Sequence, residues 1–248
     1  MRGRDYLKKY IKIQEIANEK EIYLSTNLHS TIRNILLSLP VRDERLVDQL
    51  DRSASSIYQN ISKSLCGSIK QAYYSTSVAL GSAHETKAWV DYCYKRRFIS
   101  DREYAKVSRD INYVIEELLQ KLEDLRDNGE AESFENYKVT RLDELETYQT
   151  TQNLLSKVIL YCDGRETDRT HNNERRVLEC VSNIAAYIAE GETPYRKRKQ
   201  NFLNDAYREC ITLSTELIVL LKTTKDKERL KELKSLTENL LEILLKEI

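Results

Sequence analysis

Glycine and proline are scarce in this sequence of 248 residues, which contains 6 Gly and 2 Pro. The turns of an all-β sandwich and the phosphate loops of doubly wound α/β folds draw heavily on these residues. Aromatic residues make up only 8% of the chain, whereas charged residues make up 32%, with 40 basic and 40 acidic side chains. This balance predicts an all-α protein.

The cysteines are few, odd in number and widely spaced. There are 5, at positions 66, 93, 162, 180 and 210, and no two of them form a CxxC pair. Such spacing argues against a disulfide framework or a zinc site and favours the reducing cytoplasm. The first ten residues are charged rather than apolar, and no window approaches 18 uncharged apolar residues. We therefore expect a cytoplasmic protein with no membrane partner.

The motifs of common enzymes are also missing. The sequence contains no GxxxxGK[ST], GxGxxG, HExxH or GxSxG pattern. Its 3 histidines lie far apart, and His84 and Glu85, the one adjacent His–carboxylate pair, point about 100° apart on a helix. We predict no catalytic residue, no metal ligand and no cofactor, and we expect that the protein is not an enzyme.

Apolar residues recur every three or four positions along most of the chain, which indicates long amphipathic helices. Four are expected before residue 127: one ending at Pro40, one from Asp43 to Gly67, one from Ser68, and one from Ser100. The polar segment 128–136 interrupts the pattern, which then returns up to Leu244. The sequence therefore predicts two tandem antiparallel up-down-up-down four-helix bundles, residues 1–127 and 137–248, joined by a linker at 128–136.

The two predicted bundles are related by a constant shift. An offset of 127 residues aligns Ile57 with Ile184 and Ala79 with Ala206 without a gap, which indicates a tandem duplication. Periodicity also predicts the residues of the two cores. They are Leu50, Ile57, Ile61, Ile111 and Leu118 in the first bundle, and Ile184, Leu213, Leu217, Leu240 and Leu244 in the second.

Two basic runs with tyrosines are the candidate nucleic-acid sites. The first comprises Tyr195, Arg196, Lys197, Arg198 and Lys199, and the second comprises Tyr94, Lys95, Arg96 and Arg97. Cations neutralise phosphates and tyrosine rings stack on unpaired bases, although runs of this kind also occur on solvated helix faces. Because four consecutive cations sweep almost a full helical turn, at least two of residues 196–199 should be exposed. We expect the run at 195–199 to contribute most to binding.

Four segments form a recognisable pattern: Leu46–Ala54, Ser56–Ile61 and Ala79–Glu85 in the first copy, and Ile188–Gly191 in the second. This pattern resembles bacterial four-helix-bundle proteins of the ribosomal RNA intervening-sequence type. The two copies have diverged, since the first has Ser62-Lys63-Ser64 where the family has Ala-Glu-Gly. Because the motif residues lie on helices with an apolar stripe, we expect most of them to specify packing within the bundle.

The resemblance implies a function that composition and periodicity do not give. Members of this family are encoded within intervening sequences of large-subunit ribosomal RNA genes. They are related to the accessory variability determinant of diversity-generating retroelements, a ring-shaped pentamer that binds nucleic acid and partners a reverse transcriptase. The resemblance thus implies a non-enzymatic accessory protein that binds RNA or DNA, with a reverse transcriptase and further copies of the chain as partners. The alternative is a protein-interaction or scaffold module with no nucleic-acid role.

Overall fold

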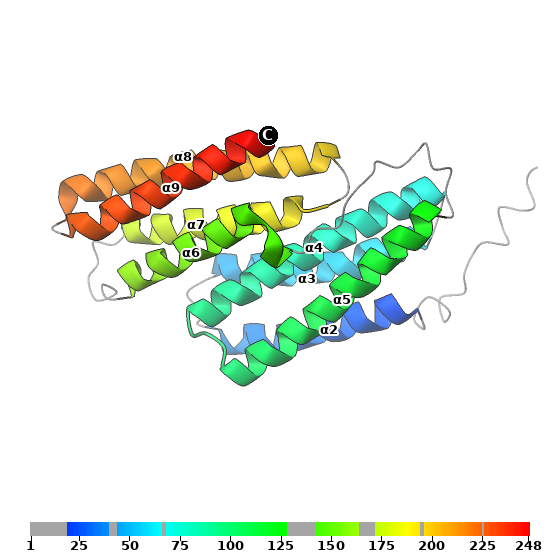
Figure 1. The fold of residues 1–248 in the computed structure, drawn as a ribbon. Helices are drawn as coiled ribbons and strands as arrows, with labels where there is room; N and C mark the ends of the chain where they lie inside the picture. Colours follow the sequence, from blue (N-terminus) through cyan, green and yellow to red (C-terminus); the bar gives the residue numbers. More distant parts are fainter. Residues whose placement is uncertain are drawn as a thin grey trace, which may run out of the picture. The chain divides into compact units, whose positions relative to one another are not determined.

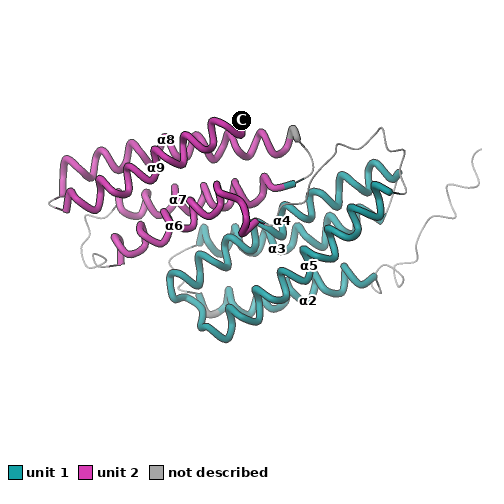
Figure 2. Tube along the Cα trace, viewed as in Figure 1, with its two compact units in different colours: residues 1–139, 193–195 teal, residues 140–192, 196–248 magenta. Residues whose placement is uncertain are grey.

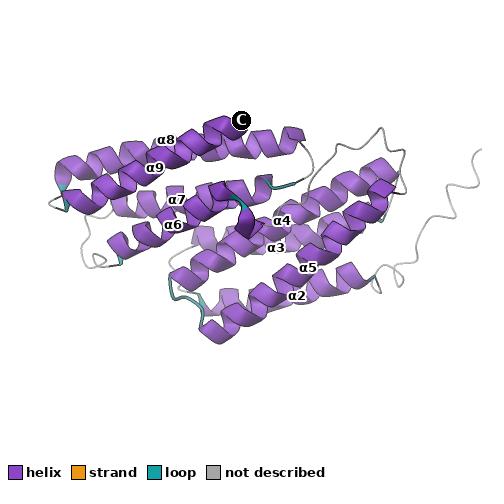
Figure 3. Ribbon diagram, viewed as in Figure 1, coloured by secondary structure: helices purple, strands orange, loops and turns teal. Residues whose placement is uncertain are grey.

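The computed structural model describes residues 19–39, 44–65, 68–127, 142–163, 172–193, 196–224 and 226–248. Within these ranges the chain forms eight α-helices, one short 3-10 helix and no strand (Figure 3). The predicted all-α class is confirmed. None of the helices in the described ranges is both long enough and apolar enough to span a membrane.

The helices divide into two compact units (Figure 2). Residues 1–139 with 193–195 form the first unit, and residues 140–192 with 196–248 form the second. The predicted linker at 128–136 lies outside the described residues, as do Pro40, Asp43 and Gly67 at the predicted helix ends.

The first unit is built from four helices that contact one another in cyclic order (Figure 1). They are α2 (Lys20–Ser38), α3 (Glu44–Ser64), α4 (Ile69–Lys95) and α5 (Asp101–Asp127). Each helix packs against the next, and α2 also packs against α5. These are the contacts expected of the predicted four-helix bundle.

The second unit repeats this order of contacts. It contains the 3-10 helix η3 (Leu142–Glu144), α6 (Glu146–Cys162), α7 (Asn172–Gly191), α8 (Arg196–Thr223) and α9 (Lys227–Glu247). Successive helices pack together, α6 also packs against α9, and η3 lies against α6.

The ten residues predicted to line the two cores are all fully buried, each with no measurable exposure. The apolar stripes of α3, α5, α7, α8 and α9, which carry these residues, therefore face the interior of their own units. For α2 and its end the periodicity predicts a stripe of Leu24, Leu28, Thr31, Ile35 and Leu39. Leu28, Ile35 and Leu39 are buried, but so is Ile32, which this stripe omits. Leu24 and Thr31, which the stripe included, are only half-buried.

Two helices begin with capping boxes. In a capping box the side chain of the N-cap residue accepts a bond from the backbone N–H three residues later, and the side chain of that later residue accepts a bond from the backbone N–H of the N-cap residue. At the start of α4 the Gln71 N–H donates to Ser68 Oγ at 3.3 Å and the Ser68 N–H donates to Gln71 Oε1 at 2.9 Å. Ser100 and Glu103 make the equivalent pair of bonds at the start of α5. Both starts agree with the prediction from the sequence.

The constant shift seen in the sequence extends to the helices. Adding 127 to the bounds of α4 gives 196–222, and α8 spans 196–223. A polar contact repeats as well: Ser82 Oγ donates to Ser56 Oγ at 2.9 Å between α4 and α3, and Asn183 Nδ2 donates to Glu209 Oε1 at 3.3 Å between α7 and α8. Both residues of the second contact lie 127 positions after those of the first. A duplication as the origin of this similarity stays a prediction.

Candidate nucleic-acid interface

The turn between α4 and α5, residues 94–101, is hereafter the α4–α5 corner. The Phe98 N–H donates to the Cys93 carbonyl and the Arg97 N–H to the Tyr94 carbonyl, each at 2.9 Å, which is the Schellman pattern that ends many helices. The residue that reverses the chain in this pattern is usually glycine. Here it is Arg97, with a φ of 57°. A left-handed arginine costs about 1–2 kcal/mol relative to an unstrained backbone.

The side chains of the corner combine cations with aromatic rings. The Arg96 guanidinium lies 5.1 Å from the ring centroid of Phe98, within the range of a cation–π contact. Burial lowers the pKa of Lys95, and the nearby Asp91 carboxylate opposes this effect. Arg97 is exposed. The predicted cations of this run thus surround one turn, with Arg97 the most accessible of them.

Tyrosine residues brace the corner from both helices. The rings of Tyr94 and Tyr104 stack, with centroids 4.0 Å apart and an interplanar angle of 9°. Tyr104 Oη donates to Asp91 Oδ1 at 2.9 Å, and burial together with this carboxylate raises the pKa of Tyr104 to about 12. Tyr104 and Asp91 were missed in the sequence analysis because neither lies in a basic run, and they meet only when α4 packs on α5.

A cavity of about 590 Å³ opens at this corner. Its volume falls within the range of small-molecule sites, about 300–1,000 Å³. The lining residues are Tyr94, Lys95, Arg97, Phe98, Ile99, Ser100 and Asp101. Cationic and aromatic groups therefore share one concave surface, which suits a phosphate carried beside an aromatic base.

The other predicted run, at 195–199, is arranged differently. Tyr195 lies outside the described residues, and Arg196 and Lys197 lie in α8 with side chains outside the description. Arg198 Nη2 lies 2.6 Å from Glu190 Oε1, and Lys199 Nζ lies 2.9 Å from Glu192 Oε2. The Arg198 and Lys199 side chains are 22% and 30% exposed, so neither is one of the two exposed cations that were expected. Their charges are compensated within the second unit.

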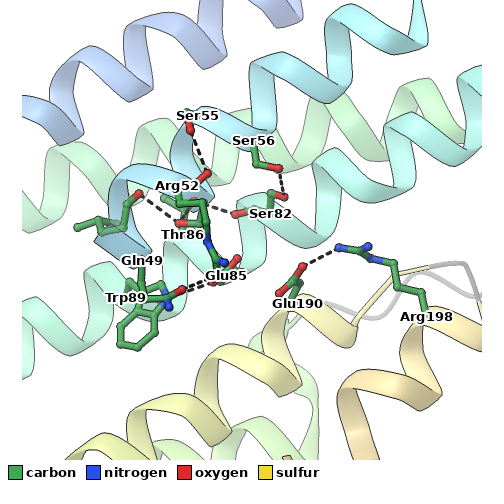
Figure 4. Close-up of polar contacts among 12 residues, drawn as sticks. Gln49, Arg52, Ser55, Ser56, Ser82, Glu85, Thr86, Trp89, Glu190 and Arg198 are labelled. Atoms are coloured by element: carbon green, nitrogen blue, oxygen red, sulfur yellow. Dashed lines mark hydrogen bonds and ion pairs between the residues drawn. The ribbon is translucent and has the colours of Figure 1, made fainter. Parts of the chain in front are cut away.

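The motif residues of α3 and α4 form a polar contact between the two helices (Figure 4). Thr86 Oγ1 donates to Ser53 Oγ at 3.0 Å, beside the bond between Ser82 and Ser56. Glu85 Oε1 accepts a bond from Trp89 Nε1 at 3.3 Å. These residues are mostly buried, which agrees with the prediction that the motif specifies packing.

The second-copy motif also has a packing role. Glu190 pairs with Arg198, as Figure 4 shows. A Cβ atom at Gly191 would lie 3.1 Å from Phe202 Cβ, closer than most real Cβ contacts. Glycine therefore permits the close approach of α7 and α8 at this point.

Metal chemistry has no candidate among the residues that the structure describes. No group of three His, Cys, Asp or Glu side chains there could hold a metal ion. His84 and Glu85 are both buried, and His29 Nε2 lies 2.9 Å from Asp51 Oδ1, which Arg33 Nε also approaches at 3.9 Å.

The described residues form an all-α structure whose α4–α5 corner brings cationic and aromatic side chains together beside Asp101. The family model described as 23S rRNA-intervening sequence protein matches residues 18–120. This range includes α2, α3, α4 and most of α5, and so contains the α4–α5 corner. The predicted resemblance to the intervening-sequence type is confirmed for this part of the chain. Comparison with curated proteins and with solved structures gives no match.

Proposed function

We propose that this chain is a non-enzymatic accessory protein that binds RNA through the α4–α5 corner of its first unit. The family description links residues 18–120 to ribosomal RNA intervening sequences, and the corner lies within that range. The observation that carries the proposal is Arg97, which holds an exposed guanidinium in a left-handed conformation where glycine would be unstrained. Strain of this kind is retained where a side chain has a function.

The corner supports the proposal better than the run at 195–199. Glu190 and Glu192 offset Arg198 and Lys199, so these two cations would have to leave their partners before they could bind phosphate. Arg97 needs no such exchange of an ion-pair partner, since no ion pair of its side chain occurs among the described residues. We therefore place the RNA contact in the first unit.

The test uses the full chain, a labelled single-stranded RNA and the variant Arg97→Gly. This change removes one cation and relieves the backbone, so we expect a higher melting temperature together with weaker binding. One lost phosphate contact should reduce affinity about 5-fold at roughly 0.1 M salt. Arg97→Lys is the matched control, because it keeps the charge and the strained conformation.

The outcomes separate the alternatives. If Arg97→Gly binds RNA as tightly as the native chain, the α4–α5 corner is not part of the binding site. Absence of RNA binding by the native chain at about 0.05 M salt would reject the function and favour the scaffold alternative. RNA recovered intact after incubation would agree with a non-enzymatic role, and cleavage would contradict it. A reverse transcriptase and a homo-oligomeric ring remain predictions that rest on the resemblance alone.

A further inference from the structure

A row of three basic side chains and a tyrosine follows the outer face of α5, and it is hereafter the α5 row. It comprises Arg102, Lys106, Arg109 and Tyr113, at spacings of four, three and four residues. At about 100° per residue these positions fall within a sector of about 60°. The buried residues Val107, Ile111, Val114 and Leu118 lie on the opposite side of the helix. The row extends about 16 Å along the helix axis.

The side chains of the row are accessible. All four are exposed, with Arg109 75% and Tyr113 47% exposed. Arg109 lies 3.6 Å from Asp110, an exposed pair of the kind that contributes little stability. Over the described ranges no ion pair involves Arg102 or Lys106. At the far end, Lys20 Nζ lies 5.5 Å from the ring centroid of Tyr113, but it is paired with Glu117 Oε1 at 2.7 Å, so we do not count it as a cation of the row.

The second unit provides an internal comparison. A shift of 126 residues, one less than the shift between α4 and α8, places four of the buried residues of α5 on buried residues of α9. The pairs are Val107 with Leu233, Ile111 with Thr237, Val114 with Leu240, and Leu118 with Leu244. The positions of the α5 row then become Glu228, Glu232, Ser235 and Asn239. The same face of the equivalent helix is thus acidic and polar. A basic row is therefore not required by the fold, and it distinguishes the first unit.

We infer that the α5 row binds an unpaired RNA strand, a conclusion that rests on the proposed function and specifies its surface. The three cations, about 6 and 4.5 Å apart along the axis, can follow the phosphates of one strand. The row begins beside the α4–α5 corner, where Tyr94 and Phe98 line the cavity, and ends at Tyr113. Aromatic groups thus occur at both ends of the cationic stretch. Unpaired bases can stack on such groups, whereas bases in a duplex already stack on one another.

This row is not among the predicted sites, because its cations are not consecutive in the sequence. The signal was a repeat of basic residues at i, i+4 and i+7 on the side opposite the apolar stripe.

The principal test compares two triple variants of the full chain. The row variant carries Arg102→Gln, Lys106→Gln and Arg109→Gln. The matched control carries Lys227→Gln, Arg229→Gln and Lys231→Gln, which remove the same charge from exposed positions of α9. The probe is a labelled single-stranded RNA of about 20 nucleotides, long enough to cover the row.

Loss of three phosphate contacts should weaken binding about 100-fold at roughly 0.1 M salt and reduce the salt slope by about 2. The control should change affinity less than about 3-fold, because those cations lie outside the row. Equal losses in both variants would show that net charge alone governs binding. If the native chain binds RNA and the row variant binds it equally well, the α5 row is not the binding surface, although the proposed function still stands. No binding by the native chain would reject both.

Tyr113 tests the choice of an unpaired strand. Tyr113→Ala should lower the affinity for single-stranded RNA by about 5-fold or more. Tyr113→Phe keeps the aromatic ring and should bind this RNA as tightly as the native chain does. Duplex RNA should bind more weakly than the single strand. Equal binding of duplex and single strand, or displacement of RNA by polyglutamate at equal charge concentration, would contradict recognition of an unpaired RNA strand.

Discussion

Truncation of Leu118 in α5 should destabilise the first unit and spare the second. The Leu118 side chain is fully buried, so its replacement by Ala leaves a cavity in addition to the lost burial of apolar surface. Such changes cost about 2.7–5 kcal/mol of the free energy of unfolding. The described helices of this unit span residues 20–127, about 110 residues, for which 1 kcal/mol corresponds to about 4 °C. A loss of about 3 kcal/mol should therefore lower the melting temperature by about 13 °C.

Leu240→Ala in α9 is the corresponding change in the second unit, since Leu240 is also fully buried. Leu37 and Leu160 supply the surface controls, because they are 86% and 70% exposed. Their replacement by Ala should change stability by no more than about 0.5 kcal/mol.

Differential scanning calorimetry measures each variant. If the two units unfold separately, Leu118→Ala shifts one transition and Leu240→Ala shifts the other. A single transition that moves equally in both variants would refute independent unfolding of the units. An unchanged melting temperature for either buried position, or a shift as large in Leu37→Ala, would refute the placement of the core.

The remaining predictions concern protonation, helix capping, thiol reactivity and proteolysis. Because the pKa of Tyr104 is raised to about 12, the folded state retains this proton above pH 10 while the unfolded state loses it, so stability should fall as pH rises from about 10 to 12. Urea unfolding at several pH values should show a smaller fall in Tyr104→Phe. Ser68→Ala should cost about 1 kcal/mol in thermal unfolding, because it removes the cap of α4. Burial raises the pKa of Cys180 to about 12, so peptide mass spectrometry should find it unmodified by iodoacetamide in the native protein and modified in urea. Limited digestion with a glutamate-specific protease should cut first within 128–136, and earlier cleavage inside a helix would contradict the predicted division.

The apolar periodicity predicted the core well because a buried stripe is a local property of each helix. Leu50 and Leu217, for example, are buried as their spacing predicts. Ile32 was missed because the predicted stripe steps three residues from Leu28 to Thr31, whereas the buried residue lies four residues after Leu28. Side-chain partners were harder to foresee. Arg198 and Lys199 are paired with Glu190 and Glu192 only because the chain reverses between α7 and α8.

The surface chemistry was only partly predictable for a similar reason. A consecutive run such as residues 94–97 is visible in the sequence, but its strained Arg97 is a property of the turn. The Tyr94–Tyr104 stack requires two helices to meet. Spacing alone could have identified the α5 row, because its periodicity is that of a single helix.

The ion pairs between α7 and α8 also bear on how the second unit folds. Glu190 and Arg198 are separated by only eight residues, and Glu192 and Lys199 by seven. Contacts between residues close in sequence require little loop-closure entropy and so form early. By contrast, α6 meets α9 through residues such as Lys157 and Glu232, which are 75 positions apart. We expect the α7–α8 hairpin to be largely formed in the folding transition state, with φ-values above those of α6 and α9. The packing of α6 against α9, which closes the unit, then follows later.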